Sequence, residues 1–328
     1  MITINTIRKP IEAELAEFNE FVKRNFSAQD GLIAEMLEYV LTSRGKGIRP
    51  ILVMLSAAMN SANEGRFGKR TFLAAMLVEM IHVASLIHDD VIDESDMRRG
   101  RASVNSRWQS RNAVLVGDYI LAKNMDLGLS SGQFDLVSHI IKSMTTLCEG
   151  ELLQSDHASK LDTSREAYFD IIYKKTASLL SVSASSGALS VGASQANVSA
   201  MRRFGEAIGI AFQIRDDILD YMPTADTGKP SNNDLRERKI TLPLIEVLEK
   251  ADEAKRAEIL SLIERCATDE SCVEQVQQWV VTSGGIEAAN QTLKSYLQRA
   301  MSILGGYEES PYRQALIDMC TFIAERNR

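Results

Sequence analysis

The stretch HVASLIHDDVIDESD, residues 82–96, combines an apolar run with a compact cluster of aspartates. Its apolar residues recur at the spacing typical of a buried helix, and the run leads directly into the pattern Asp-Asp-x-x-Asp. Asp89 and Asp93 lie four residues apart, so they share one face of the predicted helix. Like charges at this spacing cost an isolated helix about 0.2–0.5 kcal/mol. The cluster therefore favours a bound cation.

A second stretch, AFQIRDDILDY at 211–221, repeats the same arrangement 216 − 89 = 127 residues further along the chain. One such cluster is weak evidence, because charged helix ends are common on protein surfaces. Two clusters, each following an apolar run, predict a pair of facing cation sites. Oxygen ligands without nearby His or Cys select hard cations, and Mg²⁺ prefers one or two carboxylates together with substrate phosphates. The candidate metal ligands are Asp89, Asp90, Asp93, Asp216, Asp217 and Asp220.

Helical periodicity extends over almost the whole chain, whereas strand-like alternation is scarce. No Pro- or Ser-rich linker divides the sequence, and its length is ample for one large core. We therefore predict an all-α fold, with residues 1–328 forming a single large domain of about a dozen helices. The predicted helices are 11–26, 32–41, 50–60, 70–94, 112–130, 134–158, 164–188, 195–222, 239–250, 253–266, 271–282, 286–304 and 310–326.

The composition excludes several classes of protein. Lys and Arg number 37 against 44 Asp and Glu, a net charge of −7, which argues against a nucleic-acid partner. The four cysteines form no CxxC pair, and the opening residues are too polar for an export signal, so we expect a cytoplasmic protein with reduced thiols. The longest uncharged stretch, 176–201, is rich in Ser and too polar for a stable membrane anchor.

Basic residues stand close to the aspartate clusters and to the predicted helix breaks, where an anionic group would need them. Any one of them alone is more often a solvated surface charge, so the argument rests on their placement. The candidates are Lys46 and Arg49 in RGKGIRP, Arg98 and Arg99 in DMRRG, Lys174 and Lys175 in YKKTASLL, Lys229 in TGKP, and Lys239 in RERKITLP.

Taken together, GKGIRP, LIHDDVID…RRG, GELLQ, KTASLL and QIRDDILD…TGKP…KITLP resemble the trans-isoprenyl diphosphate synthase (polyprenyl synthetase) family. The motifs occur in the family's order between about residues 44 and 244. The resemblance implies a helical fold around a deep central cavity, and head-to-tail condensation of an allylic diphosphate (geranyl or farnesyl diphosphate) with isopentenyl diphosphate. It also implies a homodimer and three Mg²⁺ ions in each site when diphosphate is bound.

The resemblance also implies roles for individual residues. Asp89, Asp93 and Asp216 would bind Mg²⁺, supported by Asp90, Asp217 and Asp220; Arg98, Lys175 and Lys229 would contact the allylic diphosphate; Lys46, Arg49, His82 and Arg99 would hold isopentenyl diphosphate; and Gln154, Thr176, Gln213, Asp234 and Lys239 would complete the pocket. Oxygen dipoles of Thr176 and Gln213 are candidates for stabilising the allylic cation. The released pyrophosphate would accept the proton.

Three positions depart from the commoner family pattern. Gly47 stands where many relatives have Arg, and Asn232 and Arg238 occupy positions that are often Gly. Asn tolerates a left-handed backbone, so Asn232 is expected to be silent. Arg238 places the local loop geometry, and with it the role of Lys239, in question.

The helix before Asp89 is expected to line the cavity that receives the growing chain. Ala84 and Ser85 are small where short-chain relatives often carry aromatics, and Met80 and Ile81 lie one turn further. An open floor predicts a long product, around heptaprenyl to nonaprenyl. The alternative is a short floor restored by Phe134 or Leu153, which would give a farnesyl or geranylgeranyl product.

Two other functions use the same ionisation chemistry. A class I terpene cyclase would need neither the second aspartate cluster nor the Lys46 and Arg49 site. A catalytically silent regulatory subunit of a heteromeric synthase should have lost carboxylates, and both clusters are intact.

Overall fold

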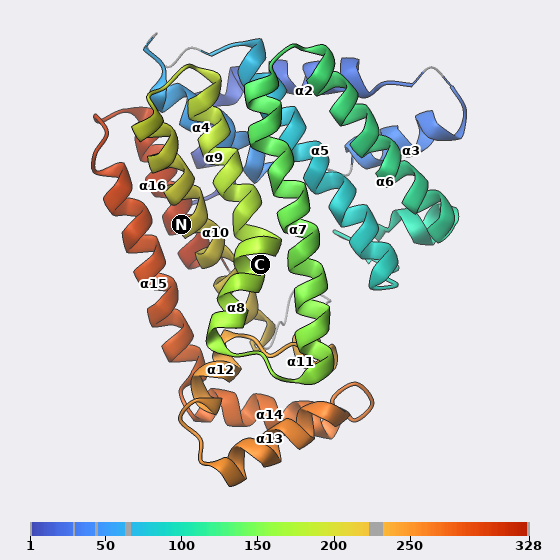
Figure 1. The fold of residues 1–328 in the computed structure, drawn as a ribbon, viewed down its shortest axis with the longest axis vertical. Helices are drawn as coiled ribbons and strands as arrows, with labels where there is room; N and C mark the ends of the chain where they lie inside the picture. Colours follow the sequence, from blue (N-terminus) through green and yellow to red (C-terminus); the bar gives the residue numbers. More distant parts are fainter. Residues whose placement is uncertain (1, 29, 43–44, 63–66, 223–231, 327–328) are drawn as a thin grey trace.

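A computed structural model describes residues 2–28, 30–42, 45–62, 67–222 and 232–326. Within these ranges the chain is a bundle of α-helices with one very short hairpin (Figure 1), which confirms the predicted all-α fold. The N-terminal half comprises α1 (Ile4–Arg8), the 3₁₀ turn η1 (Lys9–Ile11), α2 (Glu12–Phe26), α3 (Gly31–Thr42), α4 (Ile48–Asn60), α5 (Lys69–Ile92), β1 (Met97–Arg98), β2 (Arg101–Ala102), α6 (Val104–Ser130) and α7 (Phe134–Lys160). The C-terminal half comprises α8 (Arg165–Ile172), η2 (Tyr173–Ala177), α9 (Ser178–Ser190), α10 (Gln195–Asp220), α11 (Asn233–Arg236), α12 (Leu242–Leu248), α13 (Glu253–Arg265), α14 (Glu270–Thr282), α15 (Gly285–Leu304) and α16 (Pro311–Glu325).

The centre of the bundle is formed by α9, which packs against α4, α5, α7 and α10. Its many buried serines hydrogen-bond to helix carbonyls or to neighbouring elements, so they cause no unpaired polar burial. For example, the Ser183 hydroxyl donates to the Leu179 carbonyl at 2.6 Å, and Ser56 of α4 donates to the Ala184 carbonyl at 2.6 Å. Small, self-satisfied side chains let the neighbouring helices approach α9 closely.

The helices α5 and α10 carry the two aspartate clusters at their C-terminal ends. α5 is buried along most of its length between α4, α6 and α9, and α10 is buried between α9 and α15. The apolar runs that precede the clusters are therefore core segments. Their burial fixes where the two sets of carboxylates lie, while α13 and α14 lie beyond the main bundle, below it in Figure 1.

The structure differs from the predicted elements in several places. α1 and α11 were not predicted, and α6 begins at Val104 instead of residue 112. Two further differences lie next to the aspartate clusters. The segment after Asp93 forms a β-hairpin whose two-residue turn, Arg99 and Gly100, has φ values of 54° and 76°. Such a turn suits right-twisted strands, but the strands are too short to produce an alternating pattern. The helix expected over 164–188 is interrupted by η2, a π-helical turn, which periodicity analysis cannot detect because its flanks keep the helical spacing.

One described helix, α5, is long and apolar enough to cross a membrane by length and composition. In its most apolar window, 78% of the helix is buried inside the protein. A core helix reaches the same values, so this is weak evidence for a membrane span. The stretch singled out in the sequence, 176–201, does not meet the same criterion.

Candidate active site

The first aspartate cluster lies in the last turn of α5 and at its C-cap. The Asp93 N–H donates to the Asp89 carbonyl at 2.8 Å, which places both carboxylates on one side of the helix end. Burial raises the pKa of Asp89 to about 6, with the nearby Glu151 and Asp93 adding to the rise and Lys175 opposing it. Mutual repulsion of this kind is relieved when a cation binds the carboxylates.

The second aspartate of each cluster is buried and held by a protein partner. Asp90 accepts from the Arg98 guanidinium, at 2.8 Å from Nε and also from Nη2. Asp217 accepts from the Tyr168 hydroxyl at 2.6 Å and from the Gln213 amide at 2.8 Å. Burial raises the pKa of Asp217 to about 7, although both hydrogen bonds act in the opposite direction. Both side chains are therefore held by hydrogen bonds within the protein, and Asp217 also lines a cavity.

The outer aspartates of the second cluster have different surroundings. Asp220 accepts from the backbone N–H groups of Asn233 at 3.1 Å and Asp234 at 3.0 Å, so it caps the N-terminus of α11. Asp216 pairs with Arg326, the residue that follows α16. The carboxylates of α10 thus tie together three segments that are far apart in sequence.

The π-helical turn η2 presents Lys175 and Thr176 between α7 and α10. A Cβ added at Gly150 of α7 would lie 2.7 Å from the backbone nitrogen of Lys175. One added at Gly209 of α10 would lie 2.5 Å from the Ala177 Cα. Both glycines are therefore required by the close approach of backbone to backbone. Helical π-turns occur frequently at functional sites, and this one aims the Lys175 ammonium at Glu151 and Gln154, each 2.7 Å away.

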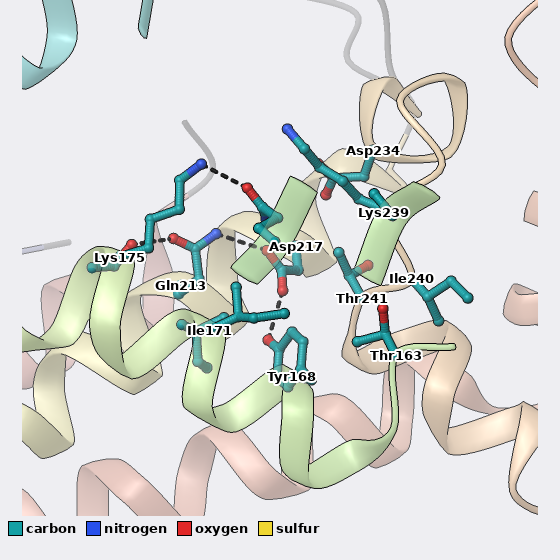
Figure 2. A pocket seen from close by; sticks show the side chains of 14 residues that line it. Thr163, Tyr168, Ile171, Lys175, Gln213, Asp217, Asp234, Lys239, Ile240 and Thr241 are labelled. Carbon is teal, nitrogen blue, oxygen red and sulfur yellow. Dashed lines mark hydrogen bonds between the residues drawn. The ribbon is translucent and has the colours of Figure 1, made fainter. Parts of the chain in front are cut away.

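A cavity of about 100 Å³ lies between α7, α8, η2 and the segment that leads into α12 (Figure 2). Its polar lining brings together residues that the sequence assigned to one pocket: Gln154, Lys175, Thr176, Gln213, Asp217, Asp234 and Lys239.

Lys239 links this cavity to the first cluster. Burial lowers the pKa of Lys239, but Glu237, Asp234 and Asp93 together raise it above its ordinary value. Lys175 likewise acts on Asp89. Asp217 of the second cluster lines the same cavity as Lys175 and Lys239, so both lysines lie near that aspartate and within electrostatic reach of the first cluster. The Asp234 carboxyl is buried, and its pKa is well above the usual range because of that burial and the charges of Asp217 and Asp220.

A basic group surrounds His82, which lies two helical turns before Asp89 on α5. Burial lowers the pKa of His82 well below its ordinary value, and Arg49, Arg99 and Arg98 lower it further, so these four side chains lie close together. Burial also lowers the pKa of Arg49 to about 10, against the attraction of Glu79. The Arg49 Nε is buried and has no hydrogen-bond partner among the described residues. Three of the four residues predicted to hold one substrate are thus neighbours.

The fourth, Lys46, lies apart from them over the ring of Phe322 in α16, with its ammonium 5.3 Å from the ring centroid. The backbone next to Lys46 is nevertheless close to the group. A Cβ added at the preceding residue, Gly45, would lie 2.3 Å from the guanidinium carbon of Arg99. Lys229 lies outside the described residues. Arg98, expected to contact a diphosphate, is engaged with Asp90.

The predicted chain-length residues lie in the buried middle of α5. Met80 and Ala84 are fully buried, and Ile81 is nearly so. The Ser85 hydroxyl donates to the His82 carbonyl at 2.9 Å. Phe134, offered as an alternative floor, is wrong for that role because its side chain is 64% exposed at the start of α7.

Sequence reasoning missed Tyr168, Glu151 and Glu79. Tyr168 stands two helical turns before Lys175, a spacing that places both on one side of a continuous helix, but a lone tyrosine is usually core. Glu151 follows the glycine of GELLQ, and Glu79 lies three residues before His82. For Glu79, the available signal was a charged residue inside an otherwise apolar run, because such residues are rarely buried without a partner.

Mg²⁺ fits the donor set of these clusters. Among the residues that the structure describes, no three His, Cys, Asp or Glu side chains converge to hold a metal by themselves. Mg²⁺ takes one or two carboxylates and completes its shell with water and substrate phosphate. Burial, Glu151 and Asp93 raise the pKa of Asp89, and a bound cation would stabilise its ionised form.

Carboxylates that can bind Mg²⁺ and basic side chains that can bind a diphosphate thus lie near one another inside a helical bundle. The model of the Polyprenyl synthetase family matches residues 30–280. The chain is 34% identical over 321 residues to the all-trans-nonaprenyl-diphosphate synthase (geranyl-diphosphate specific) of Rhodobacter capsulatus, covering 98% of this chain and 97% of that protein. It is also 34% identical to the short chain isoprenyl diphosphate synthase of Methanothermobacter thermautotrophicus, covering 88% and 89%.

Among solved structures, the decaprenyl diphosphate synthase from Rhodobacter capsulatus superposes with a TM-score of 0.90 at 32% identity, covering 99% of this chain and 100% of that one. The chain belongs to the polyprenyl synthetase family. It is a prenyltransferase of the trans-polyprenyl diphosphate synthase type, and the family depends on Mg²⁺.

Proposed function

We propose that this enzyme condenses an allylic diphosphate with isopentenyl diphosphate repeatedly and releases a long-chain trans-polyprenyl diphosphate. The observation that carries the proposal is that Lys175 and Lys239 line one cavity with Asp217 of the second cluster and interact electrostatically with Asp89 and Asp93 of the first. Cations placed there stabilise the departing diphosphate, where negative charge develops as the allylic bond breaks.

In this proposal Asp89, Asp93 and Asp216 hold the metal ions, three in number when diphosphate is bound. When bound, Mg²⁺ supplies Lewis-acid assistance to the leaving group. Asp90, Asp217 and Asp220 keep their protein partners and fix the clusters. Lys175, Lys229 and Arg98 bind the allylic diphosphate, with Arg98 also retaining Asp90.

The second diphosphate belongs to the basic group of Arg49, His82 and Arg99. Arg49 and Arg99 repel each other, and a diphosphate would relieve that repulsion. The buried Arg49 Nε supports this assignment, because a buried N–H without a hydrogen-bond partner is costly. Lys46 swings from Phe322 to join them.

Product length follows from bulk in α5. Ala84 and Ser85 add little side-chain bulk one turn before Asp89, and the exposure of Phe134 removes one alternative floor. The nonaprenyl and decaprenyl relatives support a long product, while the short-chain relative sets the competing outcome. We assign the product to the range of heptaprenyl to nonaprenyl.

The working form is proposed to be a homodimer in the cytoplasm, each chain being one domain from residue 1 to 328. The α6 helix supports a dimer, because Leu115, Tyr119 and Leu129 are 55%, 38% and 50% exposed along one side of it. Exposed apolar side chains in such a row are typical of an interface. Packing of α16 against α1 and α4 supports a single domain.

Conservative changes in the clusters test the function. Asp89→Asn and Asp216→Asn should each lower the condensation rate about 100-fold or more, and should abolish stabilisation by Mg²⁺ with inorganic pyrophosphate. Asp135→Asn is the matched control, since Asp135 is an exposed aspartate of α7 bonded to Arg70. Full activity in either cluster variant would contradict the assignment.

A further inference from the structure

A continuous hydrogen-bond chain runs from the π-turn through α10 to α8. The Thr176 hydroxyl donates to Gln213 Oε1 at 2.8 Å, and Gln213 Nε2 donates to Asp217 Oδ1 at 2.8 Å. From a different side, the Tyr168 hydroxyl donates to Asp217 Oδ2 at 2.6 Å, as Figure 2 shows. Tyr168 is thus the terminal member of a chain that ends at the reaction site.

The direction of the chain follows from the chemistry of its members. Both carboxylate oxygens of Asp217 accept a hydrogen bond, so the amide nitrogen of Gln213 faces Asp217 and its oxygen accepts from Thr176. With Tyr168 holding one carboxylate oxygen, the other is fixed in place for Gln213. The amide oxygen of Gln213 is therefore aimed at the lining shared by Lys175 and Thr176.

We propose that Tyr168 is a positioning residue for the condensation step, acting through Asp217 on the orientation of Gln213. This inference rests on the proposed function, in which oxygen dipoles of Gln213 and Thr176 stabilise the allylic cation. The cation exists only after the diphosphate leaves, so an aimed dipole lowers the barrier without tightening substrate binding.

The packing around Tyr168 allows its hydroxyl to be tested separately from its ring. Tyr168 is 3% exposed, and its ring packs edge-on against Phe169 with centroids 5.3 Å apart. Tyr168→Phe keeps the ring and this packing and deletes only the donor. Tyr221→Phe is the matched control, because Tyr221 is equally buried next to the second cluster but bonds to no carboxylate among the described residues.

The test compares steady-state kinetics of Tyr168→Phe, Tyr221→Phe and the parent enzyme. Tyr168→Phe should lower kcat about tenfold, equivalent to about 1.4 kcal/mol, with unchanged KM for both diphosphates. Tyr221→Phe should retain the parent kcat. An unchanged kcat in Tyr168→Phe, an equal fall in both variants, or loss of folding in Tyr168→Phe would each overturn the proposal.

A double-mutant cycle separates positioning from a general structural effect. If Tyr168 acts through Gln213, adding Tyr168→Phe to Gln213→Ala should lower kcat no further. If the fold-decrease in kcat of the double variant equals the product of the two single-variant decreases, the residues act independently, which would contradict the proposal. Failure of the parent enzyme to make any polyprenyl diphosphate would instead contradict the proposed function, so the two failures are distinguishable.

Discussion

Arg326 and Asp216 form an ion pair that joins the end of α16 to the second aspartate cluster. The Arg326 guanidinium is only 8% exposed, donates to the Phe212 carbonyl at 3.1 Å and lies 3.8 Å above the Phe212 ring. Arg215 in turn donates twice to the Arg326 carbonyl, at 3.0 and 2.9 Å. The positively charged Arg326 is thus paired with Asp216, a carboxylate that we propose as a metal ligand.

Removing that cation should favour metal binding at Asp216. We expect Arg326→Gln to bind Mg²⁺ more tightly by about three- to tenfold without diphosphate, since a competing charge is lost. Titration calorimetry measures this directly. Arg299→Gln, which removes a guanidinium stacked on Tyr296, is the control. Weaker Mg²⁺ binding in Arg326→Gln would mean that Arg326 orients Asp216 instead of competing for it.

Metal binding should depend on pH through Asp89. Its folded-state pKa of about 6 lies above the unfolded value, so protonation favours the folded protein, and ionisation between about pH 4 and 6 weakens it. Mg²⁺ needs the ionised carboxylate, and its affinity should be about tenfold lower at pH 5 than at pH 7. Thermal shifts with Mg²⁺ and pyrophosphate measure this trend. Asp89→Asn should flatten it, and an unaltered slope would contradict the assignment.

The floor hypothesis makes a prediction about product length. Ala84→Phe should shorten the product to twenty carbons or fewer, because the added ring fills buried space one turn below Asp89. Overpacking should also cost about 1–3 kcal/mol of stability. Chromatography of the dephosphorylated alcohols gives the length. Ser85→Ala adds no bulk and should leave the distribution unaltered; an unchanged product in Ala84→Phe would sink the hypothesis.

The π-turn should tolerate no side chain at Gly150. In Gly150→Ala the new Cβ would lie 2.7 Å from the backbone nitrogen of Lys175. This contact would displace the turn that presents Lys175 and Thr176. We expect a fall in kcat of at least about tenfold, with a loss of about 1–3 kcal/mol in stability. Gly306→Ala is a suitable control, since its Cβ would lie 3.5 Å from the Ile303 carbonyl oxygen, an ordinary van der Waals contact. Parent-like activity in Gly150→Ala would show that the turn is movable.

Arg238 carries backbone strain that glycine would remove. Its φ of 58° is left-handed, as is the 64° of Asn232, so the departure from glycine leaves the loop conformation intact. The cost for Arg is roughly 1–2 kcal/mol. Arg238→Gly should therefore raise the melting temperature with little change in activity, whereas a fall in melting temperature would indicate that the Arg238 side chain stabilises the loop.

The sequence was sufficient for the fold class and for most of the site because both depend on local patterns. Helical periodicity identifies the buried faces of α5 and α10, and the repeated aspartate cluster identifies their ends. Lys175, Thr176 and Gln213 could be assigned by motif because they lie in short stretches of specific order.

Features that depend on contacts between distant segments could not be predicted. Tyr168 acts on Asp217 from 49 residues away, and Arg326 reaches Asp216 across 110 residues. Neither pair can be recognised from the spacing of nearby residues in the sequence. The π-turn was also missed, since one extra residue in a helix is decided by close packing at Gly150 and Gly209.

The most direct measurement is the product formed by the purified protein with Mg²⁺, labelled isopentenyl diphosphate, and dimethylallyl, geranyl or farnesyl diphosphate in turn. Sizing of the dephosphorylated alcohols should give a ladder that ends at about 35–45 carbons, as the small side chains of Ala84 and Ser85 predict. A ladder that stops at fifteen or twenty carbons would contradict the long-chain assignment, and no incorporation with any primer would contradict the proposed function itself.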